Sequence, residues 1–100
     1  MSVGGWTELH DATLLSVELN WGSGEAAIRI RTGDHALPDR TILASFTRSV
    51  VCARTMPWGA SVSINQVRGP MPGGDQASVV EVELQSGDVI RIEAASFELR

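Results

Sequence analysis

Apolar and polar side chains alternate with a period of two in two long stretches of the chain. In the first stretch, residues 13–32, one face carries Leu15, Val17, Leu19 and Trp21 and, after a Gly-Ser-Gly turn, Ala26, Ile28 and Ile30. The opposite face is polar, with residues such as Glu18 and Arg29. Alternation on both sides of a Ser-Gly turn predicts a β-hairpin with one buried face.

The turn length sets the register that we expect in this hairpin. A two-residue turn at Ser23-Gly24 places Leu19 opposite Ile28. The same register places Val17 opposite Ile30, and Glu18 opposite Arg29 on the solvent face, where opposite charges attract.

The second stretch, residues 77–94, repeats the pattern. Val80, Val82 and Leu84 alternate with Glu81, Glu83 and Gln85, and Ile90, Ile92 and Ala94 continue the apolar face after Ser86-Gly87-Asp88. Pairing Leu84 with Ile90 sets Glu83 against Arg91 and, unfavourably, Glu81 against Glu93. Phe97 and Leu99 have the opposite parity from Ile92, so we expect the strand to kink near Ala94-Ala95 or to end there.

Residues 41–54 allow two interpretations. Ile42, Ala44 and Phe46 share one phase and Val51 and Ala53 share the other, which indicates a strand with a bulge near Arg48-Ser49 or two strands with a tight bend. A helix is the alternative, because Leu43, Phe46, Val50 and Ala53 are spaced 3, 4 and 3 apart. The β-branched, Ser and Thr content favours a strand.

The remaining segments are turn-rich and complete an all-β chain. We expect loops at 32–40 and 55–60, a short strand at 61–68 and a flexible connection at 69–76, where prolines and glycines interrupt a ladder. The sequence therefore predicts one domain over residues 1–100, an all-β antiparallel sandwich or small barrel of six to seven strands.

Composition suits a globular core and a reducing compartment. Apolar residues make up 43% and charged residues 20% of the 100 residues, and Cys52 is the single cysteine. Without a signal-peptide pattern at 1–9 or a long apolar run, we expect a cytoplasmic protein. The net charge is −4, with acidic ends around an arginine-rich centre. These charges either offset each other across strands or form an arginine-bearing face for an acidic partner.

The candidate chemical groups do not assemble into a catalytic or metal-binding set. His10-Asp11 resembles half of a metal phosphohydrolase signature, but only His35 remains as a further imidazole, so a turn that opens the first strand is favoured. Cys52 lies in an apolar strand, where a thiol is usually an inert packing group. We therefore expect no enzymatic activity, no metal and no cofactor.

Trp58, Arg54 and Asn65 are the candidate binding residues. Trp58 lies in a Pro-Trp-Gly loop, where the indole either closes the end of the core or projects as a binding anchor. Asn65 interrupts an alternation and marks either a bulge whose side chain bonds the backbone or a polar contact in a groove with Trp58 and Arg54. A nucleic-acid partner is not expected, because no basic patch with interleaved aromatic residues is present.

Three short motifs carry a resemblance. They are Leu9-His10-Asp11-Ala12, Pro57-Trp58-Gly59-Ala60-Ser61 with Asn65, and Gln85-Ser86-Gly87-Asp88 followed by Ile90 and Ile92-Glu93-Ala94. Together they resemble small uncharacterised bacterial β-domain proteins, some of which are similar to immunity proteins of polymorphic toxin systems.

The resemblance implies an all-β bacterial domain and carries over no catalytic residue. The functional hypothesis is a protein-interaction module, either toxin-neutralising or homo-oligomeric, without a membrane partner. The alternative is a β domain that binds a small ligand or carbohydrate.

Overall fold

Six antiparallel strands form one sheet in the computed structural model, which describes residues 9–32, 39–54 and 62–100. The strands are β1 (Thr13–Asn20), β2 (Glu25–Arg31), β3 (Asp39–Cys52), β4 (Ile64–Pro72), β5 (Ser78–Leu84) and β6 (Val89–Leu99), and their spatial order is β1-β2-β3-β6-β5-β4. The all-β prediction is confirmed, and the helical alternative for residues 41–54 is wrong. Within these ranges no helix is long and apolar enough to span a membrane.

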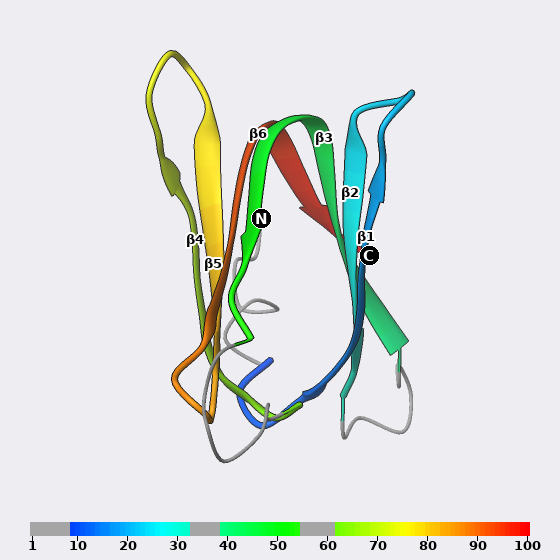
Figure 1. Cartoon of the computed structure of the whole chain (residues 1–100), viewed down its shortest axis with the longest axis vertical. Coiled ribbons are helices and arrows are strands. Elements are labelled where there is room, and N and C mark those ends of the chain that lie inside the picture. The colour runs from blue at the N-terminus through cyan, green and yellow to red at the C-terminus, as the bar shows by residue number, and fades with distance from the viewer. Residues whose placement is uncertain (1–8, 33–38, 55–61) are drawn as a thin grey trace.

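The sheet folds over on itself because its two central strands bend. Figure 1 shows β1, β2 and the first half of β3 facing β4, β5 and the first half of β6. The register of β3 shifts between Thr47 and Ser49, which confirms the predicted bulge, and Phe46 just before it has a φ of 54°. In β6, Ala95 and Ser96 are exposed between buried Ala94 and half-buried Phe97, which confirms the predicted kink.

Alternate residues of both layers fill the space between them. The fully buried large side chains are Leu9, Ile28, Ile30, Ile42, Ile64, Ile92, Val80 and Val82. They come from the turn before β1 and from every strand except β1, whose Leu14 and Val17 pack partly against the same core. Burying each such side chain contributes about 1.5–3 kcal/mol.

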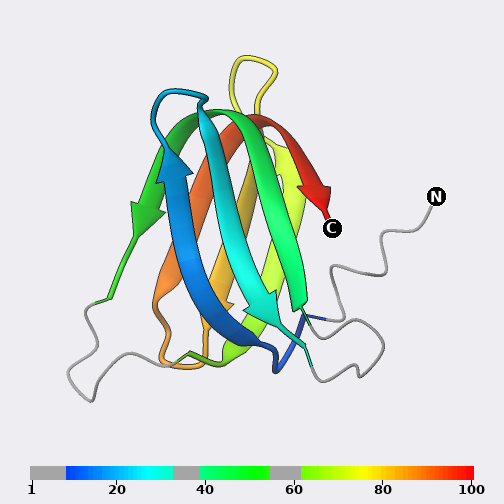
Figure 2. The ribbon, with the colours of Figure 1, turned by 90° about the vertical axis from the view of Figure 1, so that its right-hand side faces the viewer.

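The two outer strands meet at one end of the molecule. Leu14 N–H donates to the Val62 carbonyl at 2.7 Å, and Ile64 N–H donates to the Ala12 carbonyl at 2.8 Å. Figure 2 shows the start of β1 and the start of β4 together at the bottom of the molecule. The sandwich is therefore closed like a barrel at this end.

The first hairpin has the predicted faces but a different register. Its turn spans four residues, 21–24, so Asn20 pairs with Glu25, and Val17 faces Ile28 instead of Ile30. Gly24 N–H donates to the Asn20 carbonyl at 2.9 Å, and Gly24 has a φ of 74°. A shift of two residues leaves every side chain on its own face.

Two side chains of this hairpin depart from the expected pairing. Glu18 faces Ala27 and reaches Arg29 only diagonally, at 3.9 Å. A bulge between Leu14 and Ser16 turns Leu14 inward and leaves Leu15 exposed, so Leu15 does not share the buried face as predicted.

The second hairpin shows the same kind of shift. Val82 faces Ile90 and Glu81 faces Arg91, because the turn is closed by Leu84 N–H donating to the Asp88 carbonyl at 2.9 Å. The unfavourable Glu81–Glu93 contact that the predicted register required is therefore absent from this pairing, and Glu81 instead lies 3.6 Å from Arg91.

β4 extends through the segment where we predicted a flexible connection. The predicted strand at 61–68 is displaced, and the ladder continues past it, with Met71 paired to Val79 and Pro72 to Ser78. The prolines are tolerated because β4 is an edge strand that needs hydrogen bonds on one side only. Likewise Asp39 and Arg40 belong to β3 instead of the predicted loop, while the predicted loop at 55–60 lies outside the described residues.

Candidate interaction site

The three sequence-predicted binding residues do not form the expected groove. Trp58 lies outside the described residues, and Arg54 is exposed just beyond the end of β3. Asn65 sits at a register shift between Ile64 and Gln66, so the predicted bulge is confirmed. Its side-chain amide donates to the Glu83 carboxylate at 2.9 Å, not to the backbone.

Asn65 belongs to a network of charged side chains on the outer face of β4, β5 and β6. Arg68 donates to Glu81 at 3.0 Å and to Glu83 at 2.8 Å, and Arg91 lies 3.6 Å from Glu81. The hydrogen bonds from Arg68 and Asn65 lower the pKa of Glu83, and those from Arg68 to Glu83 and Glu81 raise the pKa of Arg68. These groups bind one another, so the charges offset each other across neighbouring strands, as the first charge interpretation predicted.

The other candidate groups also have structural partners. His10 and Asp11 lie in the turn before β1, where Asp11 has a φ of 66° and its N–H donates to the Ile64 carbonyl at 2.8 Å. The His10 Nδ1 contacts the Asn65 carbonyl, and Gln85 donates to the Asp11 carboxylate at 3.3 Å. In the described ranges no three His, Cys, Asp or Glu side chains are grouped so that they could hold a metal ion.

The expectation of an enclosed Cys52 is wrong. Cys52 is the last residue of β3 and is exposed, because the strand ends at the border of the sheet. Partial burial nevertheless raises the pKa of its thiol, which keeps the sulfur protonated and weakly nucleophilic at neutral pH.

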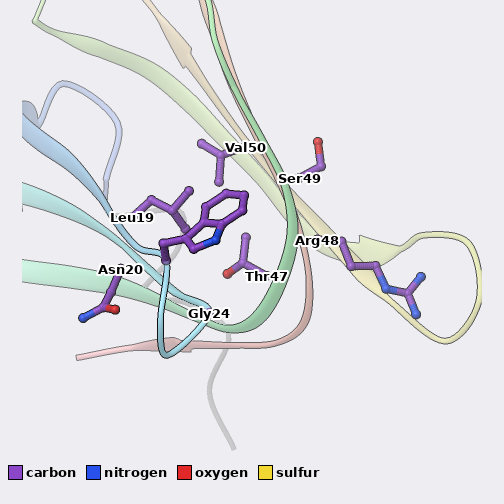
Figure 3. Close-up of a pocket in the computed structure, with 8 residues that line it drawn as sticks. Leu19, Asn20, Gly24, Thr47, Arg48, Ser49 and Val50 are labelled. Carbon is purple, nitrogen blue, oxygen red and sulfur yellow. The ribbon is translucent and has the colours of Figure 1, made fainter.

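A hollow of 410 Å³ lies where the β1–β2 turn meets the bend of β3. It is lined by Leu19, Asn20, Trp21, Gly24, Thr47, Arg48, Ser49 and Val50. Figure 3 shows the side chains of Leu19, Thr47 and Val50 gathered at its centre, and Arg48 extending away from them. The centre of the hollow is therefore formed by two aliphatic side chains and by Thr47, whose hydroxyl is polar, and further polar groups surround it.

Backbone contacts hold the two walls of the hollow together. Thr47 N–H donates to the Gly24 carbonyl at 2.8 Å, which joins the bend of β3 to the β1–β2 turn. Arg48 donates to the carbonyls of Gly74 and Asp75, at 3.5 and 3.2 Å, so its guanidinium is drawn toward the β4–β5 turn.

Two aromatic side chains beside this junction are solvent-exposed. Trp21 lines the hollow and is 89% exposed, and Phe46, which directly precedes Thr47, is 77% exposed. Alternation alone places both on a buried face, but β1 ends before Trp21, and the left-handed backbone of Phe46 breaks its phase with Ile42 and Ala44. The position of Trp21 directly before a Gly-Ser-Gly turn is the sequence signal for its exposure.

Comparisons of the chain with protein-family models, with curated proteins and with solved structures find no match. The functional argument therefore depends on the geometry of this hollow and the surface around it.

Proposed function

We propose that the protein is a protein-interaction module that binds its partner through the hollow and its aromatic border. The observation that carries the proposal is the exposure of Trp21 and Phe46, at 89% and 77%, beside an apolar hollow. Exposed large apolar side chains next to a hollow are typical of interaction sites, and tryptophan is enriched among residues that dominate binding energy.

The surface is also held in place before binding. The turn that carries Trp21 is fixed by Ser23 N–H donating to the Asn20 side chain at 3.1 Å and by the bond from Thr47 to Gly24. A preorganised surface loses less conformational entropy on association, so more of the contact energy appears as affinity.

The polar groups of the hollow support binding over catalysis. The residues that line it include amide, hydroxyl and guanidinium groups but no carboxylate, imidazole or thiol. General acid–base and nucleophilic catalysis need a titratable group or an activated nucleophile at the site.

Photo-crosslinking tests the proposal in cells of the native source. A benzophenone amino acid replaces Ser23, which is exposed beside Trp21, and in a matched control it replaces exposed Gln66 on the outer face of β4. We expect a discrete protein crosslinked from position 23 and not from position 66. Trp21→Ala should remove that product, since truncating such an anchor costs about 2 kcal/mol or more of binding energy. Identical products from both positions, or none from position 23, would contradict the proposal.

The size of the hollow favours one second candidate, a small-ligand binder. A volume of 410 Å³ falls within the range of about 300–1,000 Å³ that is typical of ligand pockets. Titration of a glycan and metabolite panel against wild type and Trp21→Phe separates the candidates. A ligand-dependent fluorescence change that Trp21→Phe abolishes supports ligand binding, and no change across the panel counts against it.

A further inference from the structure

Among the described residues, no strand pairs with one side of the second half of β3, next to the hollow. β2 pairs with β3 only as far as Ala44, whereas β6 follows β3 to Cys52. Ala53 N–H donates to the Val89 carbonyl of β6 at 3.5 Å. Because antiparallel strands alternate the direction of their backbone groups, those of Val50 and Cys52 point to the opposite, open side.

This edge differs from the other edges of the sheet. β4 carries Pro70 and Pro72 and a register shift, and β1 has a bulge and is tied to Val62 at its start. Proteins use prolines, bulges and charges to prevent unwanted pairing at edges. The residues from Ser49 to Cys52 include neither proline nor charge, and Val51 is 54% exposed.

We propose that a second copy of this chain occupies the edge, with the two β3 strands paired antiparallel around a two-fold axis at Val51. This inference rests on the proposed function, because it names the partner of the same surface. The regular run after the bulge, residues 49–53, is centred on Val51, and opposed residues must lie on the same face of a sheet.

The edge is complementary to itself in this register. Val50 faces Cys52 of the second copy, Ser49 faces Ala53, and Val51 faces its own equivalent, so no charge opposes another within residues 49–53. One position further out the same register sets Arg48 toward Arg54 of the second copy, but Arg48 lies in the bulge and its guanidinium is drawn to the Gly74 and Asp75 carbonyls. In the chain itself Val50 and Cys52 pair with Ile92 and Ile90, which places both on the inner face. An uncharged, β-branched edge selects a strand of the same kind, which its own sequence provides.

The symmetry also accounts for the exposed apolar residues. An axis perpendicular to this part of the sheet keeps the β1–β2 hairpins of both copies on the same side of the joined sheet. β1 and the end of β3 lie at the same side of the view in Figure 2, in the two opposite layers that Figure 1 shows. Val50 belongs both to the proposed seam and to the lining of the hollow, so the hollow with Leu19 and Trp21 lies next to the second copy.

Sedimentation equilibrium and directed disulfide formation test the pairing. We expect a concentration-dependent mass of twice the 10.7 kDa chain. In the double variant Val51→Cys with Cys52→Ser, mild oxidation should give a covalent dimer, because position 51 faces itself. The matched control, Ser49→Cys with Cys52→Ser, should stay uncrosslinked, because position 49 faces position 53.

A charge at the axis gives a second, independent measurement. Val51→Lys should weaken dimerisation at least tenfold, since two lysines would oppose each other. Val62→Lys is the matched control, because Val62 is equally exposed, at 56%, and lies at the other end of the sheet. Circular dichroism should show that both variants keep the β structure.

The outcomes separate this inference from the proposed function. A mass of 10.7 kDa at every concentration, or crosslinking through position 49 instead of 51, overturns the pairing. In that case, if the benzophenone at position 23 crosslinks a different protein, the proposed function still holds. If it crosslinks no protein, both the pairing and the proposed function are wrong.

Discussion

At the scale of single residues, the clearest physical effect is the one on Glu83. Arg68 and Asn65 donate to its carboxylate and hold its pKa below the ordinary value of 4.5. A carboxyl group whose pKa is lowered by folding stabilises the folded state above pH 4.5, and this contribution is lost as the pH falls through the lowered pKa.

We therefore predict that Glu83→Gln destabilises the protein most at neutral pH and progressively less below pH 4.5. Urea unfolding of both proteins between pH 7 and 3 measures this difference. Glu98→Gln, at an exposed position near the end of β6, is the control and should change stability by less than about 0.5 kcal/mol. A Glu83→Gln effect that does not vary with pH would contradict the assignment.

Removing either of two buried hydroxyl groups should change the free energy of unfolding, in opposite directions. Thr47 Oγ1 is buried without a hydrogen-bond partner among the described residues, whereas the Ser86 hydroxyl bonds the side chain and backbone N–H of Asp88, at 3.2 and 3.4 Å. Thr47→Val should stabilise by about 1 kcal/mol, and Ser86→Ala should destabilise by about 1–3 kcal/mol. Thermal and urea unfolding measure both, and a destabilised Thr47→Val would show that its hydroxyl has a partner.

At the scale of elements, Gly69 controls whether β4 can pair with β5. Its φ is 109°, and a Cβ there would meet the Val79 carbonyl oxygen at 2.5 Å, inside van der Waals contact. Gly69→Ala should destabilise by about 1–3 kcal/mol for the strained backbone alone. Gly74→Ala, where nothing lies within 4 Å of the added atom, should be nearly neutral. Equal stability of the two variants in urea would contradict the described path of β4.

Among the elements, the sequence predicted the faces of the strands better than their registers. Alternation placed most apolar residues of β2, β5 and β6 on the correct face, because a period of two depends only on the pleat. It did not reveal the two-residue shifts in both hairpins, since pairing displaced by two keeps every face unchanged. Turn length decided these registers, and at 21–24 the Asn20 side chain and Gly24 stabilise a longer turn than the sequence suggested.

The candidate site was less predictable than the strands. The hollow forms where the turn near residue 22 contacts the bend near residue 47. The two segments are distant in the sequence, so no local pattern predicts their contact. Trp21 and Phe46 matched the apolar phase of their strands, and only the end of β1 and the left-handed backbone at Phe46 expose them. Asn65 was recognised as a bulge, but its partner Glu83 depends on the pairing of β4 with β5.

At the scale of the whole molecule, one sheet is folded into two layers that are joined at one end and open beside β3. The joined end is held by the bonds between 12–14 and 62–64. The open side carries the hollow and the backbone of Val50 and Cys52, which no other described strand pairs. The same bend of β3 that lets both layers share a core also separates its second half from β2. The architecture thereby creates the surface that we propose for binding.

Amide hydrogen exchange along β3, followed over a range of protein concentrations, tests this account most directly. At low concentration the amides of Ser49 and Val51 should be protected by β6, while those of Val50 and Cys52 exchange rapidly. At high concentration Val50 and Cys52 should gain protection as the second strand pairs with them. Rapid exchange at these two positions at every concentration, or full protection in the most dilute sample, would contradict it.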